Sequence, residues 1–320
     1  MMHYDDMARR HQHVTFHDRR AFHTVHVRHM NNFVKSCFID AAVRTVFARD
    51  DKNHIDVADI AGGRGQDQSK WMYAARSAGN GRIGTYYGLD LSPADTEFAV
   101  NMSEKWFPKA KRLFICGDMT RGFPDLPDAS VDVVSCQLAL HYVCDSPDRV
   151  SALLSEMRRV LRPAGLVLLS FTDGRSVVRR ARDLLRRDTK PDDVLVGSNQ
   201  YCTFRIAAKC VGRSVPSPWN LPYSFCMRDS VENVDEFLCH EGAIVALAAR
   251  VGLRLGVSRA FDEAAVTFAR VPKYAEIGDK MDGTGTQDPH ALDTAALYRM
   301  CVLSPNADVL NMYAKCLHQP

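Results

Sequence analysis

The chain has 320 residues, of which 46% are hydrophobic, 25% charged and 9% aromatic, as is typical of a globular protein with a sizeable core. No apolar run approaches the ~18 residues that a membrane-spanning helix needs, so the sequence excludes a transmembrane protein. The formal net charge of +3 is too small to indicate a nucleic-acid partner by itself.

The first 29 residues contain seven of the 12 histidines and five arginines, with little hydrophobic periodicity. We therefore expect residues 1–28 to form a flexible His/Arg-rich extension, with a basic arm for RNA or a partner as the alternative. This polar start has no apolar signal segment, which favours an intracellular protein. The ten cysteines are scattered without a CxxC pair, so we expect reduced core thiols and no metal site.

From residue 30 onward, strand patterns alternate with helical patterns. Apolar residues at helical spacing predict a helix over 30–47, and a Ser followed by Pro predicts the start of another at 92–106. A third is expected over 148–161. Short apolar runs predict strands at 55–60, 84–90, 112–118, 130–137 and 164–172. This alternation predicts an α/β fold with a doubly wound, mostly parallel sheet flanked by helices.

The second half of the chain is less regular. We expect a helix over 174–187, whose arginines form either an RNA-binding surface or an ordinary solvated face. Strand candidates are 200–206, 221–227, 253–261 and 296–303, a helix is expected over 241–252, and the polar, Gly-rich stretch 275–292 reads as a loop.

Doubly wound sheets bind ligands beyond the carboxyl ends of their strands. Here those ends carry the cluster Ala61–Gly65, followed by Asp90, Asp118 and Gln137. A glycine loop between a strand and a helix serves both dinucleotide and S-adenosylmethionine sites. The third glycine of the dinucleotide fingerprint is missing, and no GK[ST] follows, which excludes a P-loop. Asp90 suits a ribose diol, which both cofactors have.

Three segments carry a resemblance: RHMNNFVKS (28–36), DIAGGRGQDQSKW (59–71) and SCQLALHY (135–142). Together they resemble the eukaryotic mRNA cap guanine-N7 methyltransferases, with shorter similarities at PYSF, VDEF and ALYRM. The resemblance covers about residues 28–303. It implies a class I methyltransferase (Rossmann-like) domain over 29–303, with a core at 29–173. Residues 174–303 would supply a cap-site insertion and the final strands, and 304–320 would be a C-terminal tail.

The resemblance also implies site residues. S-adenosylmethionine would be bound by Lys35 through its carboxylate, by Ala61 and Gly63 along the methionine moiety, by Asp90 at the ribose, by Asp118 beside the adenine, and by Gln137 and Tyr142. The cap would be bound by Asn31 and Asn32 at the nucleotide, by Arg64 and Lys70 at the triphosphate, by His141 and Glu236 at guanine, and by Tyr298 flanking the base. Two departures are Ala61, where the family has glycine, and Arg64, where it has lysine.

The resemblance therefore implies transfer of a methyl group from S-adenosylmethionine to N7 of the guanine cap (GpppN) of mRNA. Guanine N7 has a free lone pair, so no general base and no nucleophile is expected, and His141, Tyr142 and Glu236 would orient the reactants. The alternatives are a class I small-molecule methyltransferase and a non-catalytic subunit that binds RNA or a capping enzyme. We expect a monomer that binds neither a membrane nor a metal ion. A guanylyltransferase or triphosphatase of the capping pathway is the expected protein partner. The expected location is the nucleus, with the cytoplasm as the alternative.

Overall fold

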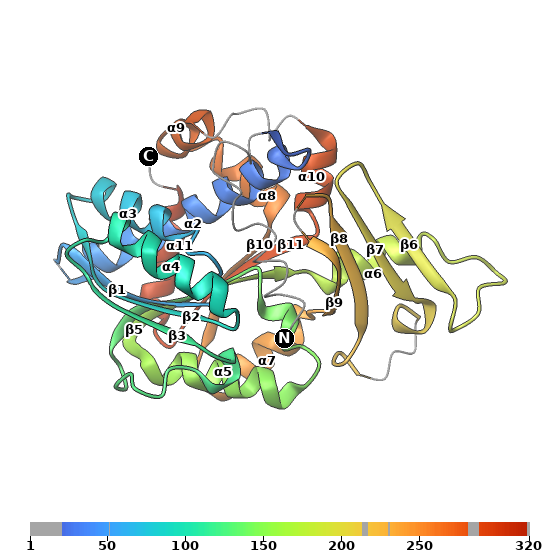
Figure 1. The fold of residues 1–320 in the computed structure, drawn as a ribbon, viewed down its shortest axis with the longest axis horizontal. Coiled ribbons are helices and arrows are strands. Elements are labelled where there is room, and N and C mark those ends of the chain that lie inside the picture. The colour runs from blue at the N-terminus through green and yellow to red at the C-terminus, as the bar shows by residue number, and fades with distance from the viewer. Residues whose placement is uncertain (1–20, 51, 213–216, 230, 281–287, 319–320) are drawn as a thin grey trace.

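The computed structural model describes residues 21–50, 52–212, 217–229, 231–280 and 288–318. The predicted extension at 1–28 therefore lies largely outside the described residues. Within them, one seven-stranded sheet forms the centre of the molecule, and a smaller four-stranded sheet stands beside it (Figure 1).

The large sheet has the strand order β10-β11-β5-β4-β1-β2-β3. Its strands β1 to β5 are mutually parallel, and β11 inserts antiparallel between β5 and β10. The chain builds β1, β2 and β3 in one direction and then returns to place β4 on the other side of β1. This reversal opens a crevice at the carboxyl ends of β1 and β4, where doubly wound folds bind ligands. The strands are β1 (His54–Ile60), β2 (Arg82–Asp90), β3 (Lys111–Cys116), β4 (Val131–Gln137), β5 (Leu161–Thr172), β10 (Arg254–Ala260) and β11 (Tyr298–Ser304).

Helices cover both faces of this sheet and bury one apolar core on each (Figure 1). One face carries α2 (Val25–Asp50), α3 (Gln68–Ser77), α4 (Pro93–Trp106) and α11 (Ala307–His318). The other carries α5 (Pro147–Val160) and α7 (Glu241–Arg250). The predicted cap of α4 is confirmed, because the Ser92 hydroxyl accepts from the Asp95 backbone N–H at 3.2 Å and Pro93 opens the helix.

The small sheet is antiparallel, with the order β6-β7-β8-β9, and follows α6 (Gly174–Arg182). Its residues alternate between buried and exposed, and the buried side chains of Phe204, Tyr223 and Phe225 join the core around α2. The strands are β6 (Val194–Ser198), β7 (Cys202–Ala207), β8 (Pro222–Met227) and β9 (Val231–Phe237). The remaining helices are α8 (Phe261–Phe268), α9 (Pro272–Lys280) and α10 (Pro289–Ala295).

Several sequence expectations are wrong in detail. The predicted tail 304–320 contains α11, whose apolar residues Val309, Tyr313 and Leu317 are buried, and the Tyr313 hydroxyl donates to the Phe38 carbonyl at 3.0 Å. The predicted loop 275–292 contains the end of α9 and part of α10, and α2 begins at Val25 rather than at residue 30. Helix α6 ends at Arg182, five residues before the predicted end. Cys116, expected in the core, is exposed because β3 lies at the sheet edge. Among the described helices, none is both long and apolar enough to cross a membrane.

Candidate active site

The loop from β1 to α3 turns sharply at the crevice. Ala61, Gly63 and Gly65 all have positive φ angles, of 54°, 50° and 70°. A Cβ at Gly65 would stand 2.4 Å from the Gln68 amide nitrogen, whereas a Cβ at Gly63 would meet nothing within 4 Å. The loop therefore needs glycine at Gly65 for packing and leaves open space beside Gly63, where a ligand can approach the backbone.

Ala61 adopts a left-handed conformation that L-residues disfavour. We expect Ala61→Gly to raise the free energy of unfolding by about 0.5–1 kcal/mol, because relief of the left-handed strain exceeds the added freedom of the unfolded chain. Urea denaturation of the purified variant measures this. Ala58→Gly, in the buried strand β1, is the matched control and should destabilise. A destabilised Ala61→Gly variant would contradict the strain argument.

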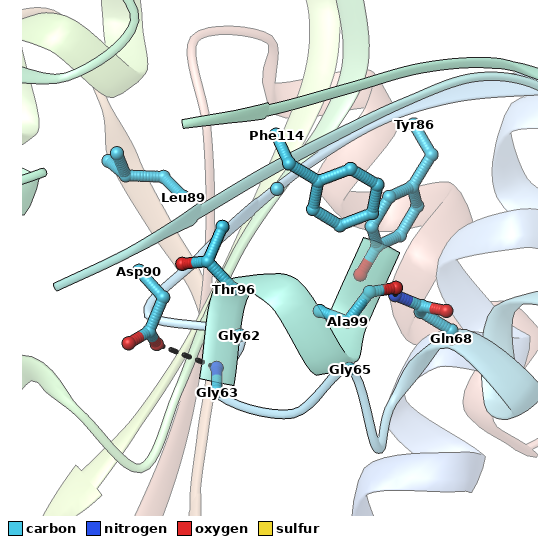
Figure 2. Close-up of a pocket in the computed structure, with 11 residues that line it drawn as sticks. Gly62, Gly63, Gly65, Gln68, Tyr86, Leu89, Asp90, Thr96, Ala99 and Phe114 are labelled. Carbon is cyan, nitrogen blue, oxygen red and sulfur yellow. Dashed lines mark hydrogen bonds between the residues drawn. The ribbon is translucent and has the colours of Figure 1, made fainter. Parts of the chain in front are cut away.

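Asp90 ends β2 beside this loop, and backbone N–H groups hold its carboxylate; Figure 2 shows the hydrogen bond from Gly63. Oδ2 accepts from the Gly63 N–H at 2.7 Å, and Oδ1 accepts from the Ser92 N–H at 2.9 Å. Burial raises the pKa of Asp90, and hydrogen bonds from the backbone N–H groups of Ser92, Gly63 and Leu91 oppose that shift. Asp90, Tyr86 and Phe114 line a small cavity of about 10 Å³ next to the loop (Figure 2).

Two lysines share one buried carboxylate next to the loop. Asp67 Oδ1 lies 2.8 Å from Lys35 Nζ and 2.7 Å from Lys70 Nζ. Burial would raise the pKa of Asp67, but the two ammonium groups outweigh it and hold that pKa well below its usual range. Nearby Asp59, hydrogen-bonded by the Tyr86 hydroxyl at 2.5 Å, has its pKa raised to about 7 by burial and by Asp67. Asp59 thus offsets only part of the surplus positive charge of this cluster.

A cavity of about 190 Å³ opens where α2, the 3₁₀ turn η3 (Leu140–Tyr142) and the small sheet meet. Helix α2 contributes four polar residues at the spacing i, i+3, i+4 and i+7, which places them on one face of the helix. These are Arg28, Asn31, Asn32 and Lys35. The other lining residues are Gln66, Leu138, His141, Tyr142, Thr172, Phe225, Met227, Glu236 and Tyr298.

A carboxylate and an imidazole meet in the cavity wall. Glu236 Oε1 lies 3.5 Å from His141 Nε2, and both side chains are almost completely buried. Burial raises the pKa of Glu236 to about 7, against the hydrogen bond that its Oε2 accepts from the Tyr223 hydroxyl. Burial lowers the pKa of His141 to about 3, so the imidazole is neutral at physiological pH. The Tyr142 ring packs edge-on against that imidazole, with ring centroids 4.2 Å apart.

Some buried polar atoms in the cavity wall lack a hydrogen-bond partner among the described residues. The side-chain oxygen of Asn31 and the Nδ1 atom of His141 are buried, and neither has a hydrogen-bond partner among the described residues. Buried polar atoms are normally paired, so both positions favour contact with a polar ligand. Tyr298, from β11, completes the wall, and burial raises the pKa of its hydroxyl well above the usual value.

The structure does not bring every predicted site residue to the cavity. The Arg64 guanidinium lies over the Phe98 ring at 3.9 Å, and Lys70 is buried against Asp67, so neither lines the cavity as a triphosphate contact would. Gln137 is buried and accepts from the Ser170 hydroxyl at 2.8 Å. The Asp118 carboxylate accepts from the Thr120 backbone N–H at 2.8 Å and caps the next turn. The roles of Gln137 and Asp118 toward the cofactor stay predictions.

Sequence reasoning missed residues that complete the site. Arg28 lies one helical turn before Asn31. Its spacing of seven residues from Lys35 places both side chains on the same face of the helix, and this spacing could have predicted its position. Tyr223 lies within the noted PYSF segment, but nothing in the sequence pairs it with Glu236. Phe225 and Met227 alternate with partly buried residues, as in any strand that packs one face on a core, so their position in the cavity wall has no sequence signal.

The reversal of strand order, the antiparallel β11 and a glycine loop facing an acidic residue define a class I S-adenosylmethionine-dependent methyltransferase. More narrowly, the model of the mRNA (guanine-N(7))-methyltransferase domain matches residues 1–304, so the chain belongs to that family.

Named relatives agree with this family. The chain is similar to mRNA cap guanine-N(7) methyltransferase 1 of Arabidopsis thaliana, at 26% identity over 90% of this chain and 77% of the relative. The protein of the same name from Oryza sativa has the same identity and coverage. An mRNA cap guanine-N(7) methyltransferase of Drosophila melanogaster is 24% identical over 74% of this chain and 55% of the relative.

Proposed function

We infer that the protein transfers a methyl group from S-adenosylmethionine to N7 of the guanine cap of mRNA. The observation that carries this function is the buried carboxylate of Glu236 facing His141 in one cavity, which Lys35 and the asparagines of α2 also line. Such a cavity combines a cationic side chain, Lys35, which can bind an anion, with a carboxylate, Glu236, which can accept hydrogen bonds from the N–H groups of a base. Family membership supports the same reaction.

The cofactor end of the site fits S-adenosylmethionine. The Asp90 carboxylate, oriented by Gly63 and Ser92, would accept from the two ribose hydroxyls. Lys35, which carries part of the surplus positive charge around Asp67, would hold the amino-acid carboxylate. The open space beside Gly63 would admit the ligand to the loop backbone. When bound, S-adenosylmethionine supplies an electrophilic methyl group.

The other end of the cavity fits guanine. The Glu236 carboxylate would accept from guanine N1–H and from its exocyclic amine at once. Adenine offers no such donor pair, so it would leave a buried charge unpaired and would be rejected. Asn31, Asn32 and His141 supply further polar contacts, and Tyr142 and Tyr298 offer ring surfaces for the base.

The chain's own residues then act by orientation and charge. Guanine N7 carries no proton, so no base is required, and holding the reactants in line can contribute ~7–11 kcal/mol to lowering the barrier. Guanine gains positive charge in the reaction, which the Glu236 carboxylate stabilises. His141 is neutral and therefore does not oppose that charge.

Beyond the reaction itself, we propose that the protein acts as a monomer in the nucleus. Its substrate, GpppN-ended RNA, is the product of guanylyl transfer to a diphosphate RNA end, so a guanylyltransferase and a triphosphatase would act before it.

A methyl-transfer assay tests the proposed function. Labelled S-adenosylmethionine is incubated with the protein and RNA ending in GpppN, RNA ending in ApppN, or triphosphate RNA, and the product is digested to detect 7-methylguanosine. Transfer to the GpppN end alone is expected. Cofactor binding by calorimetry without transfer to any RNA would favour a small-molecule methyltransferase, and failure to bind cofactor would favour a non-catalytic subunit.

Asp90→Ala should abolish cofactor binding, because it removes the acceptor that the loop backbone holds in place. Loss of a charged hydrogen-bond acceptor for two hydroxyls is expected to weaken binding by about 100-fold or more. Isothermal titration calorimetry with S-adenosylmethionine measures the effect, and a thermal melt checks folding. Tight binding by a folded Asp90→Ala protein would overturn this assignment.

A further inference from the structure

We propose that Tyr223 is a positioning residue for cap recognition: its hydroxyl holds the Glu236 carboxylate in the orientation that accepts the Watson–Crick edge of guanine. This inference rests on the proposed function and deepens it, because it names the residue that makes the guanine acceptor selective. Tyr223 does not line the cavity itself and acts through Glu236.

The two residues form a cross-strand pair. Tyr223 of β8 lies directly opposite Glu236 of β9 in the antiparallel ladder, so both side chains emerge from the same face of the small sheet. The Tyr223 hydroxyl donates to Oε2 of Glu236. The relative exposures are 2% and 3%, so no bulk water competes for this hydrogen bond.

This hydrogen bond occupies one lone pair of Oε2 and leaves the other lone pairs of the carboxylate for further contacts. Oε2 is tied to Tyr223, while Oε1 faces His141 at 3.5 Å. A glutamate side chain has three rotatable bonds, and a buried donor at one oxygen removes most of that freedom before the ligand arrives. The remaining lone pairs of both oxygens then face the cavity in a fixed fork, which suits two parallel N–H donors.

Glu236 is also the group in its surroundings that titrates near neutral pH. His141 of η3 is neutral, and burial raises the pKa of Tyr298 of β11 and of Cys239, which follows β9. The basic side chains of Arg28 and Lys35 of α2 line the same cavity, and the hydroxyl of Thr172 of β5, like that of Tyr223, lowers the pKa of Glu236 by hydrogen bonding. The pKa of Tyr223 itself is raised by burial and by Glu236, so its hydroxyl keeps its proton.

The test is Tyr223→Phe, which keeps the ring and removes only the hydroxyl. At pH 7 we expect KM for GpppN-ended RNA to rise about 10-fold, with an unchanged Kd for S-adenosylmethionine. The acidic limb of the kcat/KM profile should move up by about one pH unit, because the ionised carboxylate loses a donor. The preference for GpppN over IpppN ends, which lack the 2-amino group, should fall by about 10-fold.

Tyr201→Phe is the matched control. Tyr201 is a buried tyrosine of the same region, and its hydroxyl donates to the carboxylate of Asp288, away from the cavity. This variant is expected to keep the wild-type pH profile and the wild-type GpppN preference. A general loss of packing would instead change both variants alike.

The outcomes distinguish failure of the positioning role of Tyr223 from failure of the proposed function. A folded Tyr223→Phe enzyme with the wild-type acidic limb and selectivity would overturn the positioning role. If wild-type protein binds S-adenosylmethionine and methylates no GpppN end, the proposed function fails instead. Should Tyr223→Phe not fold, 3-fluorotyrosine at position 223 keeps the shape and strengthens the donor. The acidic limb should then move to lower pH, and an unmoved limb would overturn the inference.

Discussion

Glu236→Gln is expected to abolish cap methylation while the fold becomes more stable at pH 8. The glutamine oxygen still accepts from Tyr223, but the amide replaces one acceptor by a donor, which opposes a guanine N–H. A mismatch of this kind in a buried site lowers kcat/KM by about 10³–10⁴-fold. Cofactor binding, which uses Asp90 and Lys35, should not change. Initial rates on GpppN-ended RNA and calorimetry with S-adenosylmethionine measure the two effects separately.

The stability effect follows from the pKa of Glu236, which burial raises to about 7 from an ordinary value of 4.5. A raised carboxyl pKa favours folding below pH 4.5, and that contribution is lost as the pH rises through 7. At pH 8 the wild-type protein therefore carries a burial penalty of about 3 kcal/mol, which Glu236→Gln removes. The difference in melting temperature should vanish near pH 4.5. Full activity of the variant would show that Glu236 does not recognise guanine.

The central sheet could be predicted from the sequence because its middle strands β1 and β4 and most of β5 are buried on both faces. Parallel strands under two layers of helices appear as continuous apolar runs, and each of the first five was predicted to within three residues. The predicted α/β fold with a doubly wound sheet is confirmed. Strand β9 was missed because VENVDEF is largely polar and becomes a strand through its pairing with β8.

The candidate site was predicted only in part. Asn31, Asn32 and Lys35 share one helix face, and the resemblance placed His141 and Glu236 at one base although 95 residues separate them; the structure brings all five to one cavity. The assignment of Arg64 and Lys70 to the triphosphate rests on the family resemblance alone. Their orientation depends on Phe98 and Asp67, and a long cationic side chain carries no sequence signal of the partner it will choose.

Asp67→Asn is expected to destabilise the protein by about 3–5 kcal/mol, because it leaves Lys35 and Lys70 buried beside each other without their shared anion. Burial already lowers the pKa of Lys70, against the attraction of Asp67. Without that attraction the pKa of Lys70 should fall further. Denaturant unfolding at pH 7, for the wild type and the variant, measures the loss.

The pH dependence of stability and a second substitution test whether the loss of stability in Asp67→Asn comes from the unpaired lysines. The pKa of Asp67 lies well below its ordinary value of 3.8, so its contribution to stability is present above pH 3.8 and disappears as the pH falls further. The difference in the free energy of unfolding between wild type and Asp67→Asn should therefore disappear in acid.

Lys70→Met added to Asp67→Asn should restore much of the stability, because one buried positive charge is removed and the methionine fills the space. Lys70→Met alone leaves a one-to-one ion pair between Lys35 and Asp67. If that single variant lost affinity for capped RNA while its stability was unchanged, Lys70 would contact the triphosphate after all, and the ion cluster would not be its main role.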